Sequence, residues 1–340
     1  MKLFVLATIV LQATGGCSAP PRNVPSGDSS APATVASSAY ASVTDAPATT
    51  TLATFPGRLI TEVAVDGTDV YFVTRDVHYV DEPFTFDVRR VSTTGGPVTI
   101  VADRLSPNGF EPPHLAAGGG AVYFTGANNA VQRQGRSGEP VEVATVYGVA
   151  AIEFIDSTLW MLGTLEVGGE RSLLAVDSRG GAPRIVSHGD AYNVLSKELA
   201  FDVSSKEAFV WRRSNRGEEL VALVDDHERI GPHEPDGVAG LRLAGAELYW
   251  WSWRDKALVE ADLKTLTPTK RAETGLPLCS DRSAVVVSDA ERKQTTVIAE
   301  RGRSFQIEMS GTACALSDAL YMAEGNPSEA KLLRVPPAYR

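Results

Sequence analysis

The stretch VAVDGTDVYFVT, residues 63–74, places an apolar segment, a turn at Asp66–Gly67 and an aromatic segment in close succession. Two short apolar runs on either side of an Asp-Gly turn are typical of two antiparallel β-strands. Further along, VRRVSTTGGPVTIVA at 88–102 has the same form, with the Gly95–Gly96 pair at a second tight turn. Together, the two stretches predict four short strands.

The four-strand pattern returns along the chain. Similar turn-then-strand units are spaced about 35 to 52 residues apart and are centred on Tyr71, Tyr123, Trp160, Phe209, Tyr249, Val286 and Tyr321. Four short strands per repeat are typical of one blade of a β-propeller. Seven units without helical periodicity predict an all-β, seven-bladed β-propeller over residues 48–340. The irregular spacing also allows six or eight blades, and a β-helix or a sandwich is the structural alternative.

The last repeat is one strand short, because it ends after LLRVP at 332–336. The segment TTTLATFP at 49–56 precedes the first repeat and has no partner of its own. We expect residues 49–56 to form the outer strand of the last blade, which closes the ring and removes an exposed sheet edge.

The chain begins with MKLFVLATIVLQATGGC, residues 1–17, whose apolar run from Leu3 to Leu11 has the length of a signal-peptide core. The end of this segment, with Cys17 after three small residues, resembles the lipobox of bacterial lipoproteins, with Thr14 where that family usually has Leu. The resemblance implies cleavage before Cys17, lipidation of Cys17 and attachment to the cell envelope. In a Gram-negative host, Ser18 after the cysteine favours the outer membrane. An ordinary signal peptide with an incidental Cys17 is the alternative.

Residues 18–47 consist mainly of Ala, Ser, Thr and Pro, with Tyr40 as the only aromatic residue. Such a segment buries too little surface to offset the entropy of ordering it. We therefore expect a disordered linker between the lipid anchor and the propeller.

The hairpin patterns at 63–74 and 88–102 resemble the repeats of secreted bacterial propellers of the TolB and YWTD-like type. The resemblance covers about residues 58–340 and implies the propeller fold. Those families are mostly binding or assembly platforms, which leads us to expect binding rather than catalysis.

The composition and the absence of certain motifs argue against several classes of function. The 340 residues include 32 Lys and Arg against 42 Asp and Glu, a net charge of −10, which argues against nucleic-acid binding. Three cysteines are too few for a four-cysteine zinc module. GxSxG, phosphate-loop and HExxH motifs do not occur in the sequence. We expect a monomer without cofactor or metal.

To find candidate binding residues, we step back seven residues from the central residue of each repeat. The position reached is taken as equivalent in all the innermost strands. This alignment places seven side chains at one phase near the central axis: Ala64, Ala116, Glu153, Asp202, Arg242, Cys279 and Cys314. Glu153, Asp202 and Arg242 form either a structural ion-pair network or a ligand site. Cys279 and Cys314 lie on adjacent blades and are candidates for a disulfide, with two buried thiols as the alternative.

The second group of candidates comes from the loops that join blades or join the middle strands of a blade. Loops on a rigid scaffold often carry function. The loop-face candidates are His114, Asp190, Tyr192, His233 and Trp253. We expect a non-catalytic envelope protein that binds a protein, peptide or glycan through this face and the channel. The alternatives are a propeller enzyme of the lactone hydrolase or polysaccharide lyase type that uses the channel carboxylates, and a purely structural envelope part.

Overall fold

The computed structural model describes residues 48–77, 84–105, 112–169, 171–188, 199–202, 207–214, 216–224, 227–299, 304–326 and 328–336. The chain divides into two units, 1–37 and 38–340, and all described residues belong to the second. The predicted signal peptide, Cys17 and the predicted linker lie outside the described residues, as do Asp190 and Tyr192.

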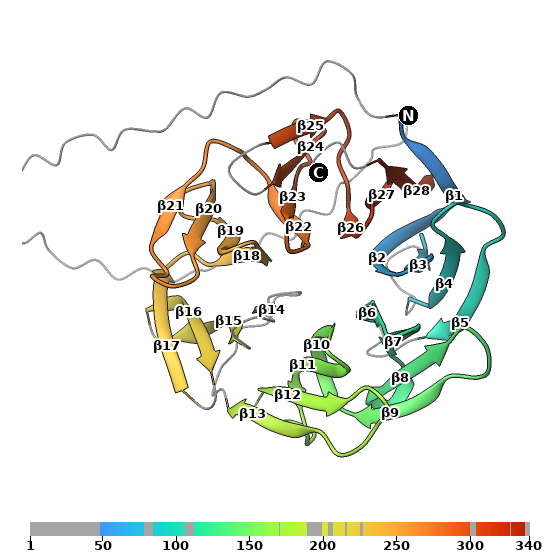
Figure 1. The fold of residues 1–340 in the computed structure, drawn as a ribbon, viewed down its shortest axis with the longest axis horizontal. Coiled ribbons are helices and arrows are strands. Elements are labelled where there is room, and N and C mark those ends of the chain that lie inside the picture. Colours follow the sequence, from blue (N-terminus) through green and yellow to red (C-terminus); the bar gives the residue numbers. More distant parts are fainter. Residues whose placement is uncertain are drawn as a thin grey trace, which may run out of the picture. The chain divides into compact units, whose positions relative to one another are not determined.

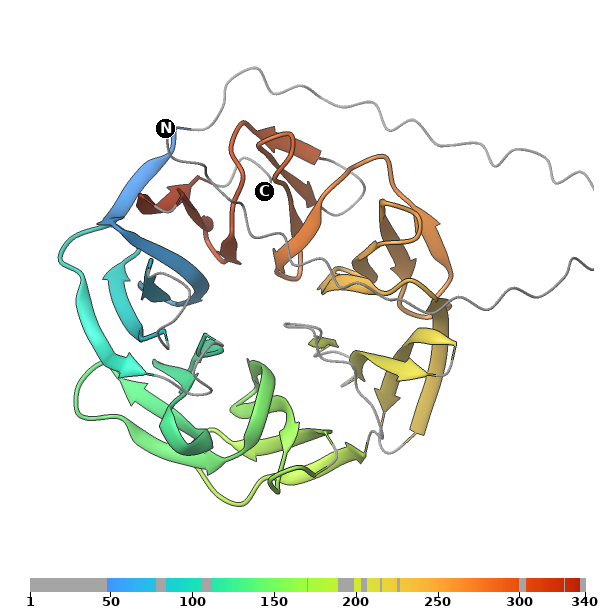
Figure 2. The same cartoon turned by 180° about the vertical axis from the view of Figure 1, so that it is seen from behind.

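The described strands form seven four-stranded antiparallel sheets. Figure 1 shows the sheets arranged in a ring, and Figure 2 shows the same ring from behind. This confirms the prediction of an all-β, seven-bladed β-propeller. The one helix among the described residues is a 3₁₀ turn, η1 (Ala127–Asn129), and none of the described helices could span a membrane.

Blades are numbered here in chain order, and in each blade the first strand listed is the innermost. Blades 1 to 4 consist of β2 (Arg58–Asp66), β3 (Asp69–Asp76), β4 (Phe86–Ser92) and β5 (Thr99–Leu105); β6 (Leu115–Gly118), β7 (Ala121–Thr125), β8 (Ala130–Gly135) and β9 (Val141–Thr145); β10 (Tyr147–Ile155), β11 (Thr158–Thr164), β12 (Ser172–Asp177) and β13 (Arg184–His188); and β14 (Leu199–Asp202), β15 (Glu207–Ser214), β16 (Gly217–Val224) and β17 (His227–Glu234).

Blades 5 to 7 complete the ring. They consist of β18 (Val238–Ala244), β19 (Glu247–Ser252), β20 (Ala257–Asp262) and β21 (Pro268–Lys270); β22 (Leu276–Ser280), β23 (Ala284–Asp289), β24 (Gln294–Ala299) and β25 (Ser304–Ile307); and β26 (Ala313–Leu316), β27 (Leu320–Asn326), β28 (Glu329–Val335) and β1 (Thr50–Pro56).

Blade 7 joins the two ends of the described chain. β1 pairs antiparallel with β28, from Thr50 opposite Arg334 to Pro56 opposite Glu329, and so forms the outer strand of this blade. In Figure 1 the blue β1 lies beside the dark red β27 and β28. Leu52 and Phe55 of β1 are buried in the apolar cluster between blades 7 and 1. The strand that precedes the first repeat therefore fills the vacant position in the last one.

Successive side chains of a strand alternate between the two neighbouring blades. Tyr71 packs in a cluster with Leu115 and Phe124 of blade 2, whereas the adjacent Phe72 packs with Tyr321 of blade 7. Each blade thus buries both faces against its neighbours, which explains continuous apolar runs such as Val70–Val73 in β3.

Candidate functional site

The innermost strands surround a cavity of about 860 Å³. Most of the residues that line it are apolar. Within the described residues, its charged side chains come from the inner strands or from residues next to them: Glu62, His114, Glu153, Asp202, Arg242, Asp281 and Arg282. The described lining thus holds four carboxylates against two guanidinium groups, so this described part of the channel is acidic when His114 is neutral.

The structure brings four of the predicted binding residues to this channel: His114, Glu153, Asp202 and Arg242. Two others lie elsewhere. His233 is exposed near the end of β17, the outer strand of blade 4, and Trp253 follows β19 with 51% of its surface exposed. The backbone N–H of Trp253 donates to the carbonyl of Gly237, in the loop that follows β17. His233 therefore lies in an outer strand and not in a loop as expected, Trp253 lies in a loop, and neither residue is among those that line the cavity.

The alignment of Asp202 needs a correction. In blade 4, Phe209 lies opposite Ala200, and Asp202 lies opposite Glu207, the first residue of β15. Asp202 is therefore two residues nearer the turn than Glu153 is in blade 3, where Glu153 lies opposite Trp160. A shift of two residues keeps the same side of the strand. Asp202 consequently faces the expected way but lies at a different depth in the channel.

The alignment of Cys314 was wrong by one residue. In blade 7, Ala315 lies opposite Tyr321, and Cys314 lies opposite Met322. A shift of one residue reverses the direction of the side chain. Cys314 therefore points back toward blade 6, where Cys279 points forward, and both lie in one apolar cluster. The two cysteines form a disulfide with a Cα–Cα distance of 5.7 Å. At equivalent phases, both side chains would have faced the same way around the ring.

Arg242 is held by backbone carbonyls of two neighbouring inner strands. Its Nε–H donates to the carbonyl of Leu278 at 2.8 Å, and Nη1 donates to the carbonyl of Leu241 at 2.6 Å. Leu241 and Leu278 each lie where the pairing of β18 or β22 with the next strand is interrupted. Such bulges leave backbone groups without ladder partners. Arg242 thus satisfies two carbonyls that the bulges release, a role that its sequence position did not indicate.

The approach of blades 5 and 6 at this point requires a glycine. Gly240 adopts a positive φ of +67°, and a Cβ there would lie 2.5 Å from the carbonyl oxygen of Pro277. A side chain at Gly240 would therefore push β18 away from β22 and separate Arg242 from Leu278.

Glu62 is a channel residue that the sequence analysis missed. It is buried, with 5% of its surface exposed, and its Oε1 lies 4.0 Å from Nδ1 of His114. The pairing of β2 with β3 shifts between Ile60 and Glu62, so that Thr61 is the extra residue. This bulge re-aims the side chain of Glu62, and nothing in the local sequence predicts it.

A second charged cluster lies between blades 5 and 6. Arg271 donates to Glu260 at 2.7 Å and to Glu273 at 2.9 Å. Burial raises the pKa of Glu260. Burial also acts to raise the pKa of Glu273, but the hydrogen bond from Arg271, the charge of Arg271 and a backbone hydrogen bond together outweigh it, so the pKa of Glu273 is lowered. The hydrogen bond from Arg271 to Glu273 also raises the pKa of Arg271. These groups satisfy one another, as expected of a structural ion network at a blade interface.

Within the described residues, no group of three or more His, Cys, Asp and Glu side chains is arranged to hold a metal ion. The geometry instead offers a charged channel with a rigid wall and, on the loop side, an exposed tryptophan. Such a site can bind a ligand by charge and shape.

Comparison with known proteins extends only to the fold. No family model matches the chain, and no curated protein is similar enough in sequence to count as a relative. The WD40 propeller domain of Doa1 is similar in structure, with a TM-score of 0.58 and 13% identity over 84% of this chain and 96% of that one. A streptogramin B lyase has a TM-score of 0.58 and 10% identity over 85% and 97%. YCF48 bound to a D1 peptide has a TM-score of 0.56 and 9% identity over 86% and 97%. At these identities the likeness shows that the chain has a β-propeller fold.

Proposed function

We propose that this protein is a non-catalytic binding or scaffold lipoprotein of the cell envelope, which holds a protein, peptide or glycan partner at the channel and the adjoining loop face. The observation that carries the proposal is the cavity of about 860 Å³ whose polar groups come from several different blades. A ligand there would contact several sheets at once, and the packed ring would hold the contact groups in place before binding. Such preorganisation favours affinity.

Charge points to the class of ligand group. The described lining has Glu62, Glu153, Asp202 and Asp281 against Arg242 and Arg282, and Arg242 already donates to two backbone carbonyls. Opposite charges across an interface favour association and orient the partner. A partner segment with ammonium or guanidinium groups suits this channel. The YCF48 structure holds a peptide, which gives a precedent for peptide binding on this fold.

The binding proposal is tested with a partner captured from an envelope extract on the immobilised full-length protein and then purified. Titration calorimetry compares wild type with the double variant Glu153→Gln, Asp202→Asn. We expect its affinity to fall at least tenfold. The matched control is Glu139→Gln, an exposed acid on the turn between β8 and β9. Equal affinities for the double variant and the control would refute a channel site.

The envelope location rests on the sequence of residues 1–47. A lipidated Cys17 partitions into the detergent phase on Triton X-114 separation, because buried acyl chains contribute about 0.8 kcal/mol per CH₂. Cys17→Ser should move the protein to the aqueous phase, and Ser18→Ala should leave it in the detergent phase. A Cys17→Ser protein that still partitions into detergent would contradict the lipid anchor.

Catalysis by the channel carboxylates is the alternative, since Glu153 and Asp202 both line the cavity. The metal content of the purified protein separates the two proposals. A stoichiometric, tightly held divalent ion that is lost in the double variant would favour a metal-dependent lactone hydrolase over a binding protein.

A further inference from the structure

The disulfide lies in the wall of the channel. Cys279 and Cys314 both line the cavity. They join the innermost strand of blade 6, near the end of β22, to the innermost strand of blade 7, near the start of β26. Only 8% of Cys279 and 5% of Cys314 is exposed. Because the bond adjoins a cavity of about 860 Å³, we consider a small dithiol as its reductant.

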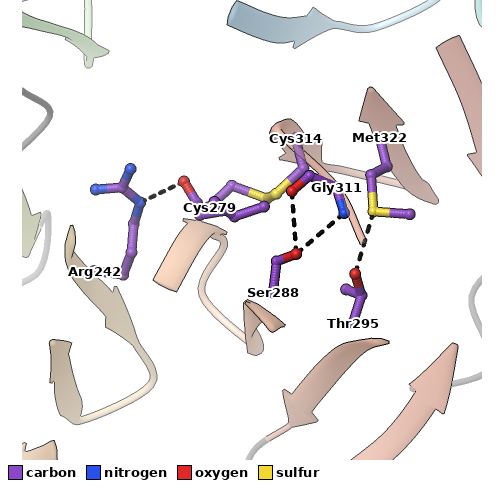
Figure 3. The surroundings of a disulfide bond; sticks show 8 residues. Arg242, Cys279, Ser288, Thr295, Gly311, Cys314 and Met322 are labelled. Atoms are coloured by element: carbon purple, nitrogen blue, oxygen red, sulfur yellow. Dashed lines mark hydrogen bonds between the residues drawn. A yellow bond between two sulfur atoms is a disulfide. The ribbon is translucent and has the colours of Figure 1, made fainter. Parts of the chain in front are cut away.

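One residue separates this disulfide from the acceptor of Arg242. Leu278 precedes Cys279 and is the bulged residue of β22, and its carbonyl accepts the hydrogen bond from Arg242 Nε–H. Figure 3 shows Arg242 on the Cys279 side of the disulfide and Cys314 on the other side. Because a bulged residue lacks a ladder partner on the neighbouring strand, its position depends on the attachments next to it.

Hydrogen bonds also join blades 6 and 7, near the start of β22 and not near Cys279. Ser288 Oγ donates to the carbonyl of Gly311 and accepts from its N–H, both at 3.1 Å. In β23, Ser288 lies opposite Leu276 at the start of β22, whereas Cys279 lies opposite Val286. The disulfide therefore links blades 6 and 7 near the end of β22, and the Ser288 contacts link them near its start.

We propose that the Cys279–Cys314 disulfide holds Arg242 in the channel wall, so that reduction of this bond by a small dithiol releases the Arg242–Leu278 hydrogen bond and changes the charge that the channel presents. As a regulation of ligand binding, this inference rests on the proposed function. In the reaction, the dithiol gives two electrons and two protons. The sulfur–sulfur bond breaks, Cys279 and Cys314 become thiols, and the dithiol becomes a cyclic disulfide.

The distances show how small a movement of Leu278 the proposal needs. Bonded sulfurs lie about 2.0 Å apart, and unbonded heavy atoms in contact lie at roughly 3.5–4 Å. Reduction therefore requires the two side chains to separate by about 1.5 Å or more. The Arg242 hydrogen bond is 2.8 Å long, and a contact near 3.6 Å is no longer a hydrogen bond. A displacement of Leu278 by about half of the sulfur separation is enough to lose it.

The test measures exchange of the Arg242 Nε–H with solvent by ¹⁵N NMR on the full-length protein, with Arg242→Gln to assign the signal. No ligand is added, so the result does not depend on whether the channel binds a partner. After treatment with dithiothreitol, with thiol titration to confirm two new thiols, we expect the exchange rate to rise at least tenfold. The double variant Cys279→Ser, Cys314→Ser should show the same rise under oxidising conditions.

Ser288→Ala is the matched control, because it loosens the link between blades 6 and 7 near the start of β22. Its Arg242 exchange should stay within twofold of wild type. The proposal is overturned if Arg242 exchange is unchanged in the reduced protein, if Ser288→Ala accelerates it as much as reduction does, or if dithiothreitol produces no thiols in the folded protein. Should the double serine variant fail to fold, the reduced wild type alone decides.

Discussion

Closure of the ring by β1 makes Phe55→Ala the sharpest stability test. Phe55 is 9% exposed, its ring centroid lies 5.5 Å from that of Phe72 in blade 1, and Arg89 lies over its ring at 5.4 Å. The residue therefore joins the outer strand of blade 7 to the next blade. Truncation removes this packing and leaves a cavity between the blades.

The expected loss follows from core truncations. Buried Phe→Ala substitutions lower the free energy of unfolding by about 3–5 kcal/mol, and the outer position of β1 places Phe55 near the lower end, at about 3 kcal/mol. The unfolding entropy is about 2.1 cal/mol/K per residue, or roughly 0.6 kcal/mol/K for a propeller of this length, so the Tm should fall by about 5 °C.

Calorimetric melting of the full-length protein measures this shift. Thr54→Ala is the control, because Thr54 is the exposed neighbour on the same strand, and surface substitutions usually stay within about 0.5 kcal/mol. A Tm for Phe55→Ala within 1 °C of the control would mean that the ring does not depend on β1, and the closure argument would fail.

Three further outcomes follow from the structure. Replacing both Cys279 and Cys314 with Ser removes a link of sequence separation 35, which should lower the free energy of unfolding by about 4 kcal/mol in chemical denaturation; a loss below about 1 kcal/mol would contradict a native disulfide. The pKa of Glu273 is lower in the fold than in the unfolded chain, so its contribution is present above about pH 4.5 and is lost as the pH falls through the folded value. Glu273→Gln should therefore flatten the acid decline in stability between about pH 5 and pH 3, and an unchanged acid slope in denaturation curves would speak against the ion network. Trp253→Ala should leave the Tm unchanged, because half of the side chain is exposed, but weaken partner affinity about tenfold by calorimetry; unchanged affinity would remove Trp253 from the binding face.

The repeat predicted the blades because an apolar strand that follows a short turn recurs in each of them. Residue-by-residue alignment was less accurate, because it assumed one turn length throughout. In blade 4 four residues separate Asp202 from its strand partner Glu207, whereas in blade 1 only Gly67 and Thr68 separate Asp66 from Asp69. Side-chain direction survives a change of two residues in that turn but not a change of one, which is why Asp202 kept its side and Cys314 did not.

The channel chemistry was harder to predict, since it depends on bulges. Thr61 and Leu278 are the extra residues in their strands, and no local pattern marks either of them. The first re-aims Glu62 into the cavity, and the second frees the carbonyl that holds Arg242. A sequence pattern of period two predicts a regular strand. A β-bulge interrupts this period, so the pattern does not predict it.

Blade 7 is attached to the rest of the described chain in two different ways. At its outer edge, β1 attaches to β28 by hydrogen bonds and by the packing of Leu52 and Phe55. At its inner edge, β26 attaches to blade 6 through a covalent bond. A pull on the chain before Thr50 acts first on β1 and its pairing with β28. Because the disulfide lies at the opposite edge of the blade, loss of β1 would leave β26 joined to β22, and the channel wall at Cys279 would keep its covalent link.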